Sequence, residues 1–386
     1  MTSIPFKYSV QNILMRKITT FFTVLGLALV VFVFSSVLML DAGLKETLVS
    51  TGENDNVIVT RRGAVTEIQS LISKEQASII EQLEGVAYIP NPQASKETVV
   101  LINLPKKNGK KSNVVIRGTN NIGLSLRRDV SITSGRIFKD GSNEIIVGAA
   151  IAKRFRNLQL GNSVKFGGDN WRIVGHFVSG GNGFESEIWS NSENLMQSFK
   201  RQTYSSVIVR LVDKQKFLNI SEAISADVRL PLQVKVEKLF YEDQSEALSN
   251  FITILGLTLT VIFSVGAIIG ASITMQAAVT NRVSEIATLR ALGFKRSAIL
   301  IAFLVESLLL ATLGGLLGLF LALCISNLEF STTNFQTFSE LAFKFSMDGE
   351  IALLSMLFAL LMGILGGLIP AFHASTIKIT EALRYC

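Results

Sequence analysis

The sequence predicts a membrane protein in which four transmembrane α-helices carry a large α+β extracytoplasmic domain between the first and the second helix. Of its 386 residues, 48% are hydrophobic and the mean hydropathy is +0.42, which is too apolar for an ordinary soluble protein. Charged residues still make up 17%, too many for a chain that lies wholly in a membrane. The apolar residues gather in four long runs, and residues 41–248 between the first two have an ordinary soluble composition.

The first two segments predict an interfacial helix and a transmembrane span. Residues 1–17 are basic and place Phe6, Val10 and Ile13 at helical spacing, so we expect a helix at the cytoplasmic surface. Residues 18–40 are apolar almost throughout, and about 20 apolar residues cross the hydrocarbon core. A cleaved signal peptide is the alternative, but its apolar region is usually about 7–15 residues long and precedes a small-residue cleavage site. No such site follows this run, so we expect an uncleaved span.

Residues 41–248 alternate short β-rich runs with helical windows and turn signals, which predicts a soluble α+β domain. Asn108-Gly109 and Gly167-Gly168 each separate two apolar runs and predict β-hairpins. We expect two subdomains, an α/β one from residues 41–118 and 205–248 and an inserted β-rich one from residues 119–204.

The remaining apolar runs predict three further spans, over residues 249–279, 299–326 and 350–372. With the N-terminus inside, this topology places residues 327–349 outside as a loop and residues 373–386 in the cytoplasm as a tail. The basic residues that flank the runs agree with the positive-inside rule and explain much of the net charge of +7. We therefore expect membrane lipid, and no nucleic acid, around this chain.

Small residues recur in these spans at the spacing of closely packed helices. The pairs are Gly266/Gly270, Gly314/Gly318 and Gly363/Gly367. We interpret them as helix packing within one subunit, and contact between two subunits is the alternative. One carboxylate, Glu306, lies well inside a span. A proton or ion relay is one interpretation; an arginine-paired or snorkelling structural glutamate is the one we favour.

A short charged segment within residues 280–298 separates the second and third spans. Val283, Ile286 and Ala287 share one helical stripe with Arg290, which predicts a short amphipathic helix. Gly293 supplies the left-handed residue that ends such a helix. By these residues alone, a loop that only fixes the topology and a helix that docks on a soluble partner are equally supported.

The run Glu285-Ile286-Ala287-Thr288-Leu289-Arg290-Ala291-Leu292-Gly293, followed by Ile299, Glu306 and Gly314–Gly318, resembles the hallmark of MacB/FtsX-like ABC permeases. The resemblance implies a periplasmic region of two subdomains and a coupling helix, within residues 280–298, whose apolar stripe enters a groove on a separate ATPase subunit. It implies ATPase-coupling roles for Arg282, Glu285, Ile286, Leu289, Arg290 and Gly293, and, through the family's closing motif, for Glu381 and Arg384. Thr380 stands where the family often has proline, which weakens this second contact.

The function that the resemblance implies is that of a permease subunit without a fused ATPase domain, in the bacterial inner membrane with both termini cytoplasmic. ATPase subunits that use ATP and Mg would drive movements of the extracytoplasmic domain (mechanotransmission) and thereby export or extract a substrate from the outer side of the membrane. A second permease subunit, identical or different, would complete a dimer. A periplasmic adaptor protein and the substrate (lipoprotein, peptide, glycolipid or drug) stay open. So do two alternatives: a signalling or regulatory complex that controls an extracytoplasmic enzyme without transport, and a receptor without ATPase coupling.

The sequence lacks the motifs of an enzyme with its own active site. It contains no G-x-x-x-x-G-K-[ST], and the glycine-rich run Ser179–Phe184 is interpreted as a flexible loop with an exposed aromatic. His176 and His373 are expected on opposite sides of the membrane, as are Cys324 and Cys386, so neither pair makes a metal site or a disulfide. We therefore expect no catalytic residue, no metal and no cofactor bound by this chain.

Overall fold

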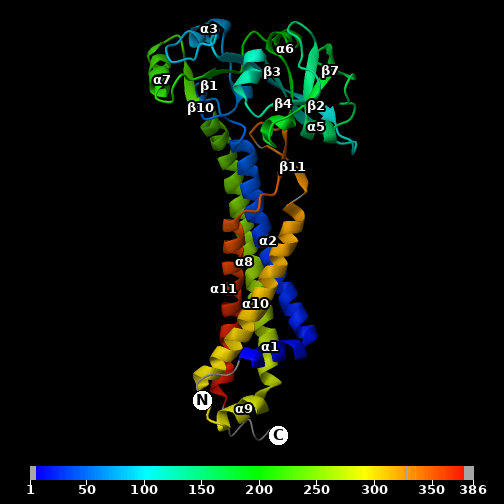
Figure 1. Cartoon of the computed structure of the whole chain (residues 1–386), viewed down its shortest axis with the longest axis vertical. Helices are drawn as coiled ribbons and strands as arrows, with labels where there is room; N and C mark the ends of the chain where they lie inside the picture. Colours follow the sequence, from blue (N-terminus) through cyan, green and yellow to red (C-terminus); the bar gives the residue numbers. More distant parts are fainter. Residues whose placement is uncertain (1–5, 327, 335, 378–386) are drawn as a thin grey trace. The chain divides into compact units, whose positions relative to one another are not determined.

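The computed structural model describes residues 6–326, 328–334 and 336–377, and the chain forms two compact units. The helical unit comprises Met1–Ala42, Phe251–Leu328 and Phe345–Cys386. The α/β unit comprises Gly43–Asn250 and Glu329–Lys344. Figure 1 traces the chain through the elements of each unit.

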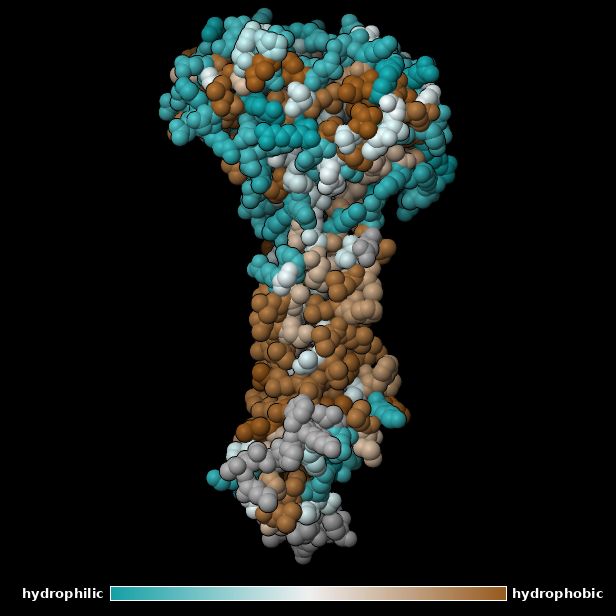
Figure 2. All heavy atoms as spheres, viewed as in Figure 1, coloured by the Kyte–Doolittle hydropathy of each residue, from teal (hydrophilic) through white to brown (hydrophobic). Residues whose placement is uncertain are grey.

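Four helices in the described residues are long and apolar enough to cross a membrane, as the sequence predicts. Hydrophobic residues cover most of the surface of these helices in Figure 2. The four are α2 (Lys17–Val49), α8 (Glu237–Thr280), α10 (Arg296–Ser326) and α11 (Gly349–Thr376). Two short helices, α1 (Phe6–Met15) and α9 (Val283–Ala291), form at the positions expected for the interfacial helix and the charged segment.

Helices α2 and α8 extend beyond the predicted spans. α2 continues past residue 40 to Val49, and α8 begins at Glu237 rather than at residue 249. Hydropathy could not reveal these turns because their sequences are polar. They are helical because they place apolar side chains on one face, where Phe240 and Tyr241 pack into the core of the α/β unit.

The glycine pairs differ in what surrounds them. A Cβ on Gly314 would lie 2.8 Å from Leu27 Cβ, and one on Gly318 would lie 2.7 Å from the carbonyl oxygen of Ala28, so α10 approaches α2 through these glycines. Gly363 and Gly367 meet Ala311 and Ser307 of α10 in the same way. Gly266 and Gly270 face open space, so packing within one subunit does not explain that pair.

The α/β unit is built on one long mixed sheet, in the order β10-β1-β9-β2-β3-β8-β5-β7-β4, with β6 paired to β7. The strands are β1 (Asn56–Arg61), β2 (Ala94–Pro105), β3 (Lys111–Thr119), β4 (Ser131–Gly135), β5 (Glu144–Gly148), β6 (Ser163–Phe166), β7 (Asp169–Val178), β8 (Glu187–Asn191), β9 (Ser206–Arg210) and β10 (Leu232–Val236). The helices are η1 (Glu67–Gln69), α3 (Lys74–Glu81), α4 (Asn121–Leu126), α5 (Ala149–Arg154), η2 (Gly183–Ser186), α6 (Ser192–Ser198) and α7 (Lys216–Ala226).

Strand β2 joins the two halves of this sheet. Its first residues, Ala94–Glu97, pair with β9, and Thr98–Pro105 pair with β3, which in turn lies parallel to β8. The hairpin between β2 and β3 forms as predicted, with Gly109 at a positive φ of 85°. Because β3 pairs with β8, it belongs with the strands of residues 119–204, and the expected subdomain boundary at residue 118 is corrected to a point within β2.

Two further expectations are corrected in this unit. Phe184 is 1% exposed and packs edge-on against Trp189, so the glycine-rich run leads into a buried aromatic rather than an exposed one. The outer loop at 327–349 contains a hairpin, β11 (Glu329–Thr333) and β12 (Glu340–Lys344), that belongs to the α/β unit. Lys106 holds it through a 2.6 Å ion pair to Glu340, and the Ala342 amide donates to Ser186.

Candidate functional site

Helix α9 is well defined at its C-terminal end. Gly293 adopts a positive φ of 93° and its amide donates to the Arg290 carbonyl at 3.1 Å, while the Phe294 amide donates to the Leu289 carbonyl at 3.2 Å. These two bonds make a Schellman motif, in which only glycine accepts the left-handed backbone without strain. At the other end, Arg282 occupies the N-cap position and its side chain makes no capping hydrogen bond.

The apolar stripe of α9 faces its own chain. Ile286 and Ala287 are each 1% exposed, and Ile286 packs among residues of α8, α10 and α11. These neighbours are Met275, Ala278, Val279, Ile299, Phe303, Ala371 and Ala374. The expectation that this stripe enters a groove on a partner is therefore corrected, because burying these side chains against the chain's own helices already removes them from solvent.

Arg282 lies at the centre of a cluster that joins three helices. Its Nε donates to Glu285 Oε2 at 2.8 Å, and its Nη1 donates to Glu306 Oε2 at 3.2 Å. Its guanidinium carbon lies 5.0 Å from the ring centroid of Tyr8 on α1 and 5.1 Å from that of Phe303 on α10. The Tyr8 hydroxyl donates to Glu285 Oε1. We call these five residues the Arg282 clamp; the expected arginine-paired role of Glu306 matches this geometry.

The charges of the clamp are fixed by their surroundings. Burial raises the pKa of Tyr8 to about 12, and its hydrogen bond to Glu285 adds to this, so the hydroxyl keeps the proton that it donates. Burial alone would raise the pKa of Glu285, but the hydrogen bonds from Tyr8 and Arg282 outweigh it and hold the pKa below its usual value. Burial works against the charge of Arg282, yet its hydrogen bonds to Glu285 and Tyr8 raise its pKa above the usual value.

A different face of α9 is open to solvent. Ser284, Thr288, Ala291 and Leu292 are exposed, Leu292 by 68%. Arg290 is half-buried; its Nη1 donates weakly to the Phe294 carbonyl at 3.5 Å, and its buried Nε has no hydrogen-bond partner among the described residues. The expected contacts at Glu381 and Arg384 lie outside the described residues.

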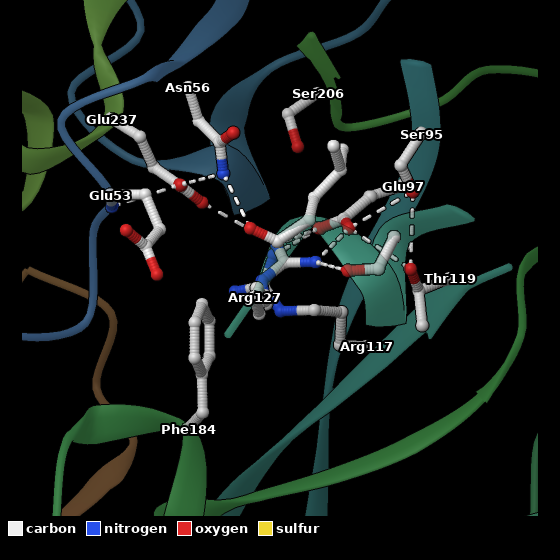
Figure 3. A network of polar contacts seen from close by, with 12 residues as sticks. Glu53, Asn56, Ser95, Glu97, Arg117, Thr119, Arg127, Phe184, Ser206 and Glu237 are labelled. Atoms are coloured by element: carbon white, nitrogen blue, oxygen red, sulfur yellow. Dashed lines mark hydrogen bonds and ion pairs between the residues drawn. The ribbon is translucent and has the colours of Figure 1, made fainter. Parts of the chain in front are cut away.

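The sequence analysis missed a second ionic cluster, inside the α/β unit (Figure 3). It consists of two arginines and four glutamates whose side chains come from distant segments. We call it the Arg117–Arg127 network, and each member is no more than 8% exposed. Its members are Glu67 in η1, Glu97 in β2, Arg117 in β3, Arg127 after α4, Glu187 in β8 and Glu237 at the start of α8.

Arg117 binds three of these carboxylates at once. Its Nη1 lies 2.8 Å from both Glu67 Oε1 and Glu97 Oε2, and its Nε lies 2.7 Å from Glu187 Oε2. Glu97 stands at the point where β2 passes from one half of the sheet to the other. The planar guanidinium suits this arrangement because its donors point in fixed directions toward several carboxylates.

Arg127 links Glu97 to the first turn of α8. It donates to both oxygens of Glu97, at 2.6 and 2.8 Å, and its Nη2 lies 3.7 Å from Glu237 Oε1. Its guanidinium stacks on the ring of Phe184, 4.6 Å from the centroid. Asn56 donates to the other Glu237 oxygen at 2.9 Å, so the α8 terminus is tied to both Arg127 and β1.

The two carboxylates that lie near Arg127 have pKa values shifted in opposite directions. Burial would raise the pKa of Glu97, but the charges of Arg127 and Arg117 outweigh it and lower the pKa to about 2. Burial dominates at Glu237, whose arginine is farther away, and its pKa is raised. Only a weak signal in the sequence points to the Arg117–Arg127 network. Arg117 follows the apolar run Val114–Ile116, and a charged side chain in a buried strand needs a partner.

Comparison with known proteins adds family information. The chain matches the family model of the MacB-like periplasmic core domain over residues 20–226 and that of the FtsX-like permease C-terminal region over residues 257–379. It is 23% identical over 408 residues to the macrolide export ATP-binding/permease protein MacB of Bdellovibrio bacteriovorus, covering 97% of this chain and 60% of that protein. It is 33% identical over 111 residues to the uncharacterized ABC transporter permease YvrN of Bacillus subtilis, covering 29% of this chain and 25% of that one. The chain thus spans about 60% of the length of the MacB relatives.

Two solved structures are similar to the chain. One is the periplasmic region of MacB from Actinobacillus actinomycetemcomitans, with a TM-score of 0.38 and 13% identity over 54% of this chain and 97% of that one. The other is the extracellular domain of the noncanonic ABC-type transporter YknZ, with a TM-score of 0.36 and 17% identity over 47% of this chain and 99% of that one.

Proposed function

The chain belongs to the MacB/FtsX-like family of ABC permeases, and we propose that it couples ATP hydrolysis by a separate ATPase subunit to movements of its α/β unit. One observation carries this proposal. Helix α8 runs without a break from Glu237, in the Arg117–Arg127 network, to Thr280, just before Arg282 of the clamp. A continuous helix can pass a displacement from one end to the other, because its backbone hydrogen bonds resist bending.

The surface offered to the ATPase is the exposed face of α9. Ser284, Thr288, Ala291 and Leu292 present a small polar and apolar surface, and the half-buried Arg290 lies beside it. Arg282 and Ile286 are largely buried and hold α9 in place, whereas Glu285, whose side chain is 42% exposed, can also contact the ATPase. Gly293 sets the direction in which the chain leaves the helix toward α10.

A second permease subunit would pack on α8. Gly266 and Gly270 lie on this helix with no atom near the position of a Cβ, and the apolar side chains around them are exposed, Ile262 by 60% and Ile269 by 54%. Two such helices can approach closely through paired glycines, which favours a dimer of identical or related chains. We propose that this dimer lies in the bacterial inner membrane with both termini in the cytoplasm, because the basic residues that flank the spans agree with the positive-inside rule.

Export or extraction of a substrate from the outer side of the membrane follows from this mechanism. The relative MacB is named for macrolide export, which supports transport over a purely regulatory complex. The ATPase subunits would supply the ATP and Mg chemistry, and this chain the movement. A periplasmic adaptor is a further proposed partner of the α/β unit.

The decisive experiment is purification of the tagged chain from native membranes, followed by mass spectrometry and an ATP hydrolysis assay. We expect an ABC ATPase to co-purify with the wild type. Leu292→Glu and Arg290→Glu should each lower co-purification strongly, since a charge that loses its partner in an interface costs about 2–5 kcal/mol. Lys110→Glu, an equal charge change to that in Arg290→Glu at an exposed hairpin turn, should have no effect. Normal ATPase binding by Leu292→Glu and Arg290→Glu would overturn the assignment of this face.

A further inference from the structure

Helix α9 lacks a side-chain capping hydrogen bond at its N-terminal end. It is nine residues long, and Arg282 is its N-cap residue. Helices this short are marginal in water unless other contacts hold them. The C-terminal end has the Schellman motif at Gly293, so the two ends differ. The first turn of α9 must be fixed by contacts with other elements, and the Arg282 clamp makes them.

The clamp holds this turn from two sides. On one side Glu306 and Phe303 belong to α10, the helix that directly follows α9 in the chain. On the other side Tyr8 belongs to α1, which is more than 270 residues away in the sequence, since the separation between Tyr8 and Glu285 is 277. The guanidinium lies between the two aromatic rings and between the two carboxylates, with a side chain 11% exposed, so its contacts are little weakened by solvent.

We propose that α1 is a latch for the coupling helix and that Tyr8 is the positioning residue through which it acts. This inference rests on the proposed function of α9. The hydroxyl of Tyr8 holds Glu285, its ring covers Arg282, and both fix the first turn of α9 at the angle from which the exposed face meets the ATPase. Glu306 serves the same clamp from α10, which gives this intramembrane carboxylate a structural task.

The chain allows the ring and the hydroxyl of Tyr8 to be tested separately. Tyr8→Phe keeps the ring over Arg282 and removes only the donor to Glu285. Tyr8→Leu removes both. Tyr88→Phe makes the same chemical change as Tyr8→Phe at a tyrosine of the α/β unit that is 70% exposed, and it serves as the control.

The first measurement follows the latch itself. Spin labels at Gln11 and Thr288, both exposed, are placed in the full-length chain in lipid nanodiscs, with Cys324 and Cys386 replaced by serine. We expect a narrow distance distribution in the wild type, a broader one with Tyr8→Phe and the broadest with Tyr8→Leu. Distributions that are unchanged in both variants would overturn the latch, whatever the ATPase does.

The second measurement separates the positioning of α9 from the binding of the ATPase. It uses the ATPase that co-purifies with the wild-type chain. Tyr8→Phe should lower the maximal ATP hydrolysis rate of the complex by about tenfold, as expected for a lost bond to a charged group, and leave the ATPase affinity within about twofold. Glu285→Gln should lower the rate at least as much, because it also weakens the charged bond from Arg282, and the double variant should be no worse than Glu285→Gln alone, because the Tyr8 hydroxyl acts through Glu285. Additive effects, or lost affinity with an unchanged rate, would overturn the proposal. If no ATPase binds the wild type, the proposed function fails, and the distance measurement still decides whether the latch exists.

Discussion

The Arg282 clamp and the Arg117–Arg127 network use the same pair of groups, guanidinium and carboxylate, under different conditions. The network is fully enclosed and holds two arginines against four glutamates. The clamp has one arginine, two carboxylates and two aromatic rings, and its Glu285 is 42% exposed at the side chain. Enclosed charges depend on every partner, since water cannot replace a lost one. Partly exposed charges can exchange partners at modest cost. The network is therefore the fixed end of α8, and the clamp, which follows the other end of this helix, can adjust only through Glu285, because Arg282 and Glu306 are buried.

The variant Arg117→Ala tests this comparison with the largest expected effect. It leaves Glu67, Glu97 and Glu187 buried without their shared cation, which should destabilise the α/β unit by about 3–5 kcal/mol. The measurement is thermal unfolding of the full-length chain in detergent, with the exposed Arg62→Ala as the control. A loss no greater than that of the control would show that the network is not the fixed end.

Arg282→Ala should have a smaller effect of about 1.5–3 kcal/mol, the range for hydrogen bonds to charged groups, because it leaves only Glu306 buried without its cation while Glu285 can turn to solvent. We expect faster amide hydrogen exchange in α9 and little change in the α/β unit, measured on the full-length chain in nanodiscs. Arg296→Ala removes an exposed arginine of α10 and should leave the exchange of α9 as in the wild type. Equal protection in both variants would contradict the clamp.

Glu237→Gln should change stability least, by less than about 1 kcal/mol. The Oε1 of Glu237 accepts no hydrogen bond from the described residues, and its arginine lies 3.7 Å away, so a neutral amide replaces the carboxylate with few losses. Glu97→Gln, in the same network, should cost several times more because two arginines bind that carboxylate. The measurement is the unfolding midpoint of each of the two variants, compared with that of the wild type. Equal losses of stability would refute the expected difference between the two carboxylates.

The pH dependence of the α/β unit gives a finer test. The pKa of Glu97 in the folded chain is lowered to about 2, so this carboxylate stabilises the fold at pH values above the ordinary glutamate pKa of the unfolded chain. This stabilisation is lost as the pH falls from there to about 2. The pKa of Glu237 is raised, so its contribution is present below the ordinary glutamate pKa and is lost as the pH rises through the raised value. The pH dependence of the unfolding midpoint should become less steep below the ordinary glutamate pKa with Glu97→Gln, and less steep above it with Glu237→Gln. Unaltered slopes would contradict the assignment.

The sequence predicted the parts of this fold that depend on local pattern. The four spans follow from apolar length, the β2–β3 hairpin from Asn108-Gly109, and the end of α9 from Gly293. The first turns of α8 escaped prediction because their polar sequence matches a soluble domain as well as a helix. The subdomain boundary was misplaced because a strand of 12 residues can serve both halves of a sheet.

The candidate site was predicted in place but not in detail. The charged segment does form a helix, yet which face is free depends on α8, α10 and α11, and a nine-residue pattern carries no information about them. For this reason the sequence analysis predicted partner contacts for both Arg282 and Glu285. The Arg117–Arg127 network joins residues more than a hundred positions apart, and only the folded chain brings them together.

The hairpin β11–β12 has a consequence for biosynthesis. The α/β unit is not continuous in sequence, since Glu329–Lys344 joins Gly43–Asn250 only after α8 and α10 have been made. A ribosome adding about 5–20 residues per second therefore exposes the partner surface of the hairpin for several seconds before Glu340 can reach Lys106. A nascent chain that stalls within α10 would present an unfinished surface on this unit.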